Sequence, residues 1–333
     1  MHIGLVRLMR EVQRIKLIKA GIGKAQKASN RREYSCMEIG CKEKAIKSHS
    51  QQKKCQLDSI AEGGWVYSVE KGLYNIFSGK PRELLVKKTI TESSRYKGYC
   101  NSHDTEIFSP IENENLDVTD AYHNYLLLLR SVSYESANKR DSYLRQIDIL
   151  KQIGELMHPQ GRSGYEASTA GIKLFLDKDS PFYFQRLKEI DEANSYSDSV
   201  TFRSFELHGN LGVSCTTCFS PLREKHSEWM TEHFESPQPF IALSIVPSQN
   251  RTLVSFCWFA EFDELCSDFK NLVNDEKLIS ILNMYAFTES EDVCISPSLW
   301  EKLSVEDRQN IYRHMGNSDS LPNAEDVPLV MRT

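Results

Sequence analysis

Hydrophobic positions follow a helical spacing in the N-terminal arm and in the middle of the chain, and a strand-like pattern from Ser199 onward. Residues 3–19 place apolar side chains near one face and Arg or Lys elsewhere, which predicts an amphipathic helix. Gly21 and Gly23 are expected to end it. Because a basic amphipathic helix serves partner docking, nucleic-acid contact and membrane surfaces equally, the pattern assigns it no function.

The middle of the chain predicts two or three helices. Asp117 to Asp120 supply N-cap residues for a long helix that runs through Leu129 and beyond, and apolar residues keep a helical spacing as far as Leu156. After a break at Pro159, the same spacing continues over 165–193. The region 117–195 is therefore expected to be helical.

The last third of the chain contains short runs of β-branched and aromatic residues. They predict strands at 200–207, 211–219, 240–247 and 252–259, with a hairpin-type turn at 247–251. Helices are predicted at 261–273, 275–287 and 304–315. The whole pattern predicts an α+β protein with a helical middle and a C-terminal antiparallel sheet accompanied by helices.

The remaining segment, 34–110, is rich in Cys and His. It contains short predicted strands at 45–49 and 65–70, and a helix that begins near Asn101. The predicted organisation is a basic helical arm (1–33), a Cys/His module (34–110), a helical region (117–195), an α+β domain (199–320) and a tail (321–333).

Composition places the chain among globular proteins. Its 333 residues allow two or three domains, and 40% apolar content is enough for sizeable cores. No run of eighteen apolar residues exists, and charges from Arg7 to Arg14 interrupt any signal-peptide core, so neither a membrane span nor export is expected. The odd count of nine cysteines fits reduced thiols. We expect a cytoplasmic protein without a membrane partner.

Charge is distributed unevenly along the chain. Residues 1–104 hold 21 Lys and Arg against 10 Asp and Glu, whereas residues 105–333 hold 20 against 36. A basic segment is an electrostatic footprint for phosphate-bearing partners such as nucleic acid. The alternative is a solvated surface that happens to be rich in Lys.

Two short pairs of metal-ligating residues lie in this basic part. Cys36 and Cys41 have four residues between them, Cys100 and His103 have two, and 58 residues separate the pairs. Two chelating pairs joined by a loop are how a chain closes a tetrahedral zinc site. The alternative is two ordinary reduced cysteines and a histidine at a helix start.

Together with two neighbouring residues, the four candidate ligands resemble a known family of sites. His49 ends a predicted strand in the sequence AIKSHS, and Asp104 directly follows His103. The combination resembles the zinc-supported form of the HNH, or ββα-metal, endonucleases. The resemblance implies a zinc-bound ββα or treble-clef-like module in which His49 activates water, Asp104 binds Mg²⁺ or Mn²⁺, and structural Zn²⁺ is held by Cys36, Cys41, Cys100 and His103.

The implied reaction is hydrolysis of a phosphodiester bond. A neutral imidazole can take a proton from the attacking water, and a carboxylate is a hard oxygen ligand for Mg²⁺. This chain has Ser48 where the family usually has an acidic residue or histidine before the strand histidine. The alternative is a non-catalytic scaffold that keeps the zinc platform to bind nucleic acid or protein, with His49 only orienting a loop.

As a whole, the sequence is similar to poorly characterised bacterial proteins with AI-x-SH and C-x-x-HD motifs, which we associate with antiphage defence. The similarity implies a protein partner docked on the acidic C-terminal part. Cys215 and Cys218 have redox or metal-site spacing but lie in a predicted strand, so they are expected to be small buried side chains. The sequence contains no phosphate-cradling GxxxxGK loop and no dinucleotide fingerprint.

Overall fold

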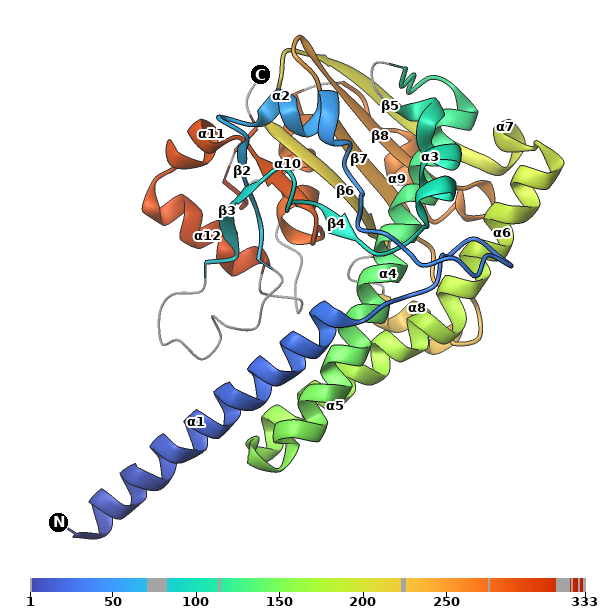
Figure 1. The fold of residues 1–333 in the computed structure, drawn as a ribbon. Coiled ribbons are helices and arrows are strands. Elements are labelled where there is room, and N and C mark those ends of the chain that lie inside the picture. Colours follow the sequence, from blue (N-terminus) through green and yellow to red (C-terminus); the bar gives the residue numbers. More distant parts are fainter. Residues whose placement is uncertain are drawn as a thin grey trace.

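The computed structural model describes residues 2–70, 83–112, 115–222, 226–274 and 276–315, together with 324, 326–328, 330 and 331. The predicted α+β class is confirmed. A seven-stranded antiparallel sheet lies between helices on its two faces, and a long N-terminal helix projects from the body (Figure 1). Within the described part of the chain, no helix has the length and apolar composition that a membrane span needs.

The sheet is assembled from distant parts of the sequence. Its strand order is β3-β2-β9-β6-β7-β8-β5, and each neighbouring pair is antiparallel. The strands are β2 (Trp65–Val69), β3 (Leu85–Thr89), β5 (Val200–His208), β6 (Val213–Phe219), β7 (Ile241–Pro247), β8 (Arg251–Phe259) and β9 (Val293–Ile295). The four long strands and the β7–β8 turn are as predicted, whereas β3 and β9 were not predicted. The stretch between the two ligand pairs thus contributes the β2–β3 hairpin to the sheet of the C-terminal half.

Strands β6, β7 and β8 are buried along almost their whole length because helices cover both sides of the sheet. Alternate residues go to opposite faces: Leu243 and Phe256 belong to the cluster with α10, and Ala242 and Cys257 to the cluster with α4. The helices of the C-terminal half are α8 (His226–Glu232), α9 (Ser267–Lys270), α10 (Glu276–Thr288), α11 (Pro297–Glu301) and α12 (Val305–Met315). The helix expected over 261–273 was wrong as a single element, since only a 3₁₀ turn at Ala260–Phe262 and the short α9 occur there.

Helix α4 (Ala121–Ile153) is the long helix predicted in the middle of the chain. Its N-cap is Asp120, whose carboxylate accepts the His123 backbone N–H at 2.9 Å, as the sequence indicated. After a short 3₁₀ turn, α5 (Pro159–Leu174) begins at the predicted break and continues through a π turn into α6 (Ser180–Ala193). A short helix, α7 (Tyr196–Ser199), leads into β5.

Helix α1 (His2–Arg31) is longer than expected. The prediction that Gly21 and Gly23 end it was wrong. Gly21 instead lies where α1 meets the end of α4, and a Cβ on it would come within 2.3 Å of the Ile153 Cγ2 atom. The glycine therefore allows two helices to approach closely, and Ile18 and Ile22 pack there against Ile149 and Ile153.

The Cys/His module adds three small elements around the candidate ligands. Strand β1 (Ser48–His49) pairs with β4 (Arg95–Tyr96), and α3 (Asn101–Phe108) follows β4. The predicted strand at 45–49 is thus confirmed only over its last two residues. An irregular turn at Lys53–Leu57, in which Cys55 takes a φ of +64°, and the one-turn α2 (Asp58–Ile60) lead from β1 towards β2.

Most of the predicted tail, 321–333, lies outside the described residues, but three of its side chains are in the core. Val327, Val330 and Met331 are buried in the cluster of the sheet and α10. The Asn283 side chain accepts the backbone N–H groups of Val330 and Met331 at 2.9 and 3.0 Å. This part of the chain is therefore docked on α10.

Substituting Gly21 by Ala should destabilise the protein, although alanine is the better helix former. The added methyl group meets Ile153, and overpacking of this kind costs about 1–3 kcal/mol. Gly164→Ala in α5 is the matched control, because nothing lies within 4 Å of its Cβ position, and it should stabilise by roughly 0.5–1 kcal/mol. Urea unfolding measures both free energies, and equal stabilisation by the two changes would contradict the packing role of Gly21.

Candidate metal centre

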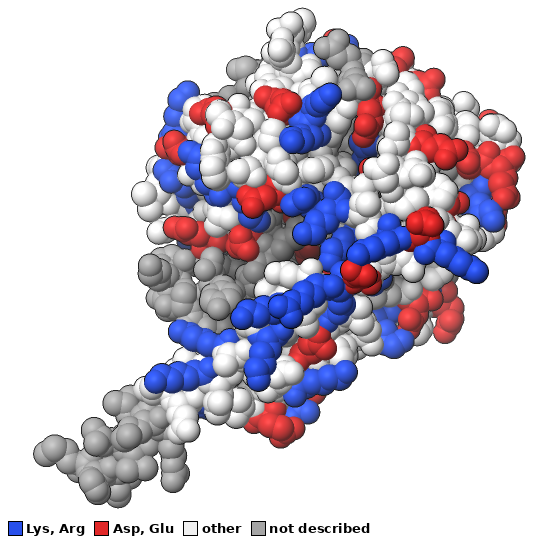
Figure 2. All heavy atoms as spheres, viewed as in Figure 1, with Lys and Arg blue, Asp and Glu red and all other residues white. Residues whose placement is uncertain are grey.

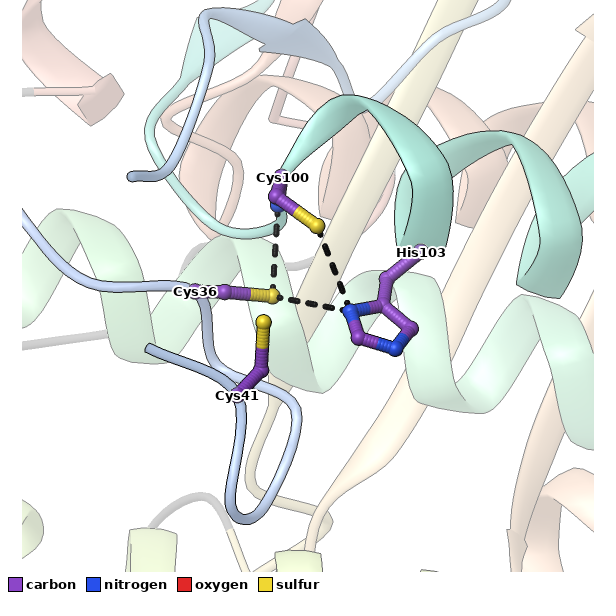
Figure 3. Close-up of side chains that lie close together, drawn as sticks. All are labelled: Cys36, Cys41, Cys100 and His103. Atoms are coloured by element: carbon purple, nitrogen blue, oxygen red, sulfur yellow. Dashed lines mark hydrogen bonds between the residues drawn. The ribbon is translucent and has the colours of Figure 1, made fainter. Parts of the chain in front are cut away.

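Four side chains from the two predicted pairs meet at one point (Figure 3). The ligand atoms of Cys36, Cys41, Cys100 and His103 all lie within 4.8 Å of one another. The His103 Nδ1 atom is 3.2 Å from the Cys100 Sγ atom and 3.5 Å from the Cys36 Sγ atom. The structure thus brings together all four residues that the sequence selected.

The first pair lies on a tight turn. The Cys36 N–H donates to the Glu43 carbonyl at 2.8 Å, and the Cys41 N–H donates to the Glu38 carbonyl at 3.1 Å. Gly40 takes a φ of +84° within this turn, a conformation that favours glycine. These bonds fold 36–43 back on itself, so that both sulfurs point to the same side.

The second pair lies at the start of α3. Cys100 is the N-cap residue and His103 is in the first turn, so both side chains lie near the N-terminal end of the helix. The Met37 N–H donates to the Gly98 carbonyl at 2.9 Å, and the Ile46 N–H donates to the Tyr99 carbonyl at 2.8 Å. These two backbone bonds hold the first turn beside the second pair.

The electrostatic surroundings differ between the two buried sulfurs. The backbone N–H of His103 lowers the pKa of the Cys100 thiol to about 7, because it stabilises the thiolate. Burial raises the pKa of Cys36 to about 11. A bound cation would favour the thiolate form of both, since metal ligation deprotonates cysteine.

The donor set suits one tetrahedrally coordinated metal ion. Ligand atoms at about 2.0–2.3 Å from a tetrahedral centre lie roughly 3.3–3.8 Å from one another. The distances of 3.2 and 3.5 Å from His103 Nδ1 to two sulfurs are close to that range. Three thiols and one imidazole can therefore hold a metal ion here, consistent with structural zinc.

The two predicted catalytic residues are placed differently. Asp104 lies beside the Ser48 hydroxyl; burial raises the pKa of its carboxyl, and Ser48 and Arg130 partly offset the rise. His49 follows Ser48 on β1 and lies opposite Arg95. Because successive residues of a strand point to opposite faces, Ser48 rather than His49 is turned toward Asp104.

The His49 imidazole is held in its neutral form. Burial lowers its pKa, and the positive charge of Arg95 lowers it further, while backbone carbonyls of residues 90 and 91 act in the opposite direction. Its Nε2 atom is buried and makes no hydrogen bond. The predicted base thus has an unpaired but buried nitrogen, on the face of β1 away from Ser48.

Arg130 is a site residue that the sequence reasoning missed. It is 5% exposed on α4, its guanidinium lies 4.4 Å from the centre of the Phe108 ring, and it bonds to Glu112 at 3.0 Å. Its charge also offsets part of the rise in the pKa of Asp104 that burial causes. The available signal was an arginine inside the apolar run LLLLRSV, where a charge needs a partner.

The other cysteine pair behaves as small buried side chains, as expected. Cys215 belongs to the core cluster on one face of the sheet and Cys218 to the cluster on the other. Because they point in opposite directions from β6, they cannot share a metal ion or form a disulfide with each other.

Replacing Cys36 with Ser should remove the bound metal and lower the thermal unfolding temperature. The substitution takes away one of four donors and leaves the others around a weakened site. Cys55→Ser is the matched control, since Cys55 lies outside the group and is half-buried. Metal content by elemental analysis and thermal unfolding measure the two effects, and folded wild-type protein without metal would overturn the assignment.

Known proteins give no guide to the role of this centre. No protein-family model, no curated protein and no solved structure matches this chain. The arrangement of the four ligands and their neighbours is therefore the basis for any functional assignment.

Proposed function

We propose that the Cys/His centre holds structural Zn²⁺ in a treble-clef-like ββα module. The chain order supports this: the Cys36–Cys41 turn comes first, then β1, its antiparallel partner β4, and α3 with the second ligand pair. All four positions are filled by protein side chains, which is typical of structural rather than catalytic zinc. Residues 50–94 are an insertion between the two strands of this module.

We propose that this module and α1 bind nucleic acid. The observation that carries the proposal is a group of exposed cations that make no ion pair among the described residues (Figure 2). This group, the basic surface, consists of Lys24, Lys27, Arg31, Lys42, Lys47, Lys53 and Lys54. Figure 2 shows Lys and Arg side chains gathered along α1 and over the segments that follow it.

The helical part of the basic surface faces away from the protein. Ile18, Ile22 and Ala25 point toward α4 and α5, whereas Lys24, Lys27 and Arg31 are exposed. At 100° per residue these cations lie within one sector of the helix, opposite the packed face. A phosphate backbone could therefore be contacted without displacing α1.

A hollow of about 370 Å³ lies beside this surface, between the end of α1, β4 and α4. Lys47, Arg95, Lys97 and Arg145 line it, against a single acidic residue, Asp141. Lys97 is partly engaged, since it donates to the Arg32 carbonyl at 2.6 Å. The excess of positive charge favours an anionic group such as a phosphate.

The acidic C-terminal part is the proposed docking site for a protein partner. Its charge opposes contact with a phosphate backbone, so nucleic acid would be confined to the N-terminal part. This division between a basic binding module and an acidic docking body is the functional organisation that we propose.

A metal-dependent nuclease is the second candidate, and two observations favour it. The order β1, β4, α3 is that of a ββα module, and His49 at the end of β1 has a lowered pKa and an unbonded Nε2. A neutral imidazole of this kind can accept a proton from water. The Asp104 carboxylate and the Ser48 hydroxyl are hard oxygen donors that would hold Mg²⁺ or Mn²⁺, which would offset charge on a phosphate.

The binding function is favoured over hydrolysis because of the surroundings of Asp104. His49 and Asp104 lie toward different faces of β1, and Arg130 already supplies a positive charge near Asp104. Within the described residues, Cys36, Cys41, Cys100 and His103 are the only group of three or more His, Cys, Asp or Glu side chains with metal-site geometry. The expected role in antiphage defence stays a prediction for both candidates.

Replacing Lys47 and Lys54 with Gln should weaken binding to DNA or RNA and flatten its salt dependence. Each lost phosphate contact reduces the slope of log affinity against log salt by roughly 1. Lys151→Gln with Lys302→Gln is the matched control, because both lysines are exposed outside the basic surface. Fluorescence anisotropy over a salt series measures the slope, and an equal effect of the control pair would contradict the assignment.

Hydrolysis is tested separately with Mg²⁺ or Mn²⁺ and labelled DNA and RNA. If the module cleaves, His49→Ala should lower the rate by roughly 10²–10⁴-fold, the usual contribution of a general base, with metal content unchanged. The wild-type rate should fall only at a pH lower than an ordinary histidine would require, because burial and Arg95 lower the pKa of His49 and so keep the base neutral to lower pH. His158→Ala, an exposed histidine elsewhere, is the control.

Absence of cleavage by the wild-type protein, together with intact binding, would overturn the nuclease and leave the binding function. The same variants in a phage plating assay test the defence role: loss of protection in the Lys47/Lys54 variant but not in His49→Ala would favour the non-catalytic candidate.

A further inference from the structure

A pocket of about 400 Å³ lies beside the Cys36–Cys41 turn, between α3, α4 and α6. Its floor is aromatic and aliphatic, including Tyr99, Tyr125, Leu129 and Phe184. The volume is within the range of roughly 300–1,000 Å³ that is typical of ligand pockets. These side chains can make contacts with apolar groups of a partner.

The rim of the pocket is acidic. Glu38, Glu106 and Asp191 line it, and Lys188 is its one lysine or arginine among the described residues; His103 of the candidate metal centre also lines it. Lys188 lies 3.6 Å from Glu192, which offsets its charge. Glu38 and Glu106 are exposed and make no ion pair within the described residues, so the rim carries unbalanced negative charge. The complementary partner is an apolar segment flanked by cations.

The distal part of α1 has these properties. Val12, Ile15 and Leu17 are 46%, 41% and 52% exposed, and Lys16 and Lys19 beside them are exposed and unpaired in the described structure. The helix projects beyond the body there (Figure 1). Arg14, which bonds to the Leu156 carbonyl at 2.8 Å, is the first described residue with a hydrogen bond to the body.

The exposed part of α1 cannot enter the pocket of its own chain. Helix α1 packs at Ile149 and Ile153 near the end of α4, whereas Tyr125 and Leu129 in the pocket lie near its beginning. The 24 residues from Tyr125 to Ile149 span about 36 Å of helix. Because α1 is docked at one end of α4, its exposed residues cannot reach the pocket at the other end.

We propose that the pocket receives the distal part of α1 from a second copy of this chain. Val12 and Ile15, three residues apart, lie on neighbouring positions of the helix surface and enter the apolar floor. Lys16 and Lys19 lie against Glu38 and Glu106. Each copy carries one helix and one pocket, so two copies related by a twofold axis can satisfy both contacts at once. The proposal is independent of nucleic-acid binding.

The test is the molar mass of the full-length protein in solution over a concentration series, by light scattering or sedimentation. The wild-type protein should be a dimer. High salt should weaken the association because it screens exposed ion pairs. Ile15→Asp should weaken the dimer by at least tenfold. Lys19→Glu and Glu106→Lys should each weaken it, and the two together should restore it.

Glu306→Lys is the matched control, since it makes the same change of charge at an exposed position on α12. Metal content and circular dichroism check that each variant is folded. A wild type that stays monomeric throughout would overturn the proposal. So would an Ile15→Asp dimer of wild-type strength, an equal effect of Glu306→Lys, or a double charge reversal that is no tighter than either single one.

Discussion

The N-terminal half of α4 is buried on every side, and the positions of the other elements follow from that burial. Residues 124–134 are all buried, polar ones included, because the helix lies between the sheet and the metal-centre region. The Asn and Ser side chains in this stretch form hydrogen bonds with nearby backbone carbonyls. The Asn124 amide bonds to the Val118 and Asp120 carbonyls, and Ser131 and Ser133 bond to carbonyls one turn earlier in the helix. A helix that is buried all round needs partners on all sides, and the metal centre supplies one of them.

The metal centre is thereby part of the main core rather than a separate small domain. Cys36, Tyr99 and Cys100 belong to the same cluster as Cys257 and Phe259 of the sheet. The Tyr99 hydroxyl lies 2.8 Å from the Ser133 hydroxyl on α4, which ties the start of α3 to the central helix. A metal ion bound at this centre would therefore support packing as far as the sheet. The stretch 50–94, between β1 and β4, is held to the same body at both ends: the Ser50 and Ser94 hydroxyls both bond to the buried Asp292 carboxylate beside β9.

Features that depend on neighbouring residues in the sequence were predictable, whereas features that depend on contacts between distant segments were not. The metal ligands were predictable because each pair is set by a short turn or a helix start, and the N-cap at Asp120 for the same reason. Gly21 was misread because a glycine that ends a helix and one that admits a neighbouring helix look alike in sequence, and Ile153 lies far along the chain. Strands β3 and β9 were missed because their place is set by pairing with partners from other regions. The likeness of His49 and Asp104 to a catalytic pair rested on their order in the sequence. That order does not show whether Asp104, on α3, lies on the same side of β1 as the His49 side chain.

The same alternation along β1 bears on what the N-terminal module does. A catalytic pair acting on one phosphate must converge on it, yet Asp104 is on the side of Ser48 and Arg130, and His49 is opposite Arg95. Lys47, Arg95 and Arg145 gather at a hollow near the His49 side of β1, and the exposed lysines continue from there along α1. Arg95 lines this hollow, whereas Asp104 does not. The proposed recognition of an anionic backbone at this face therefore requires only the cations gathered there, whereas the proposed hydrolysis requires His49 and Asp104 to act on the same phosphate.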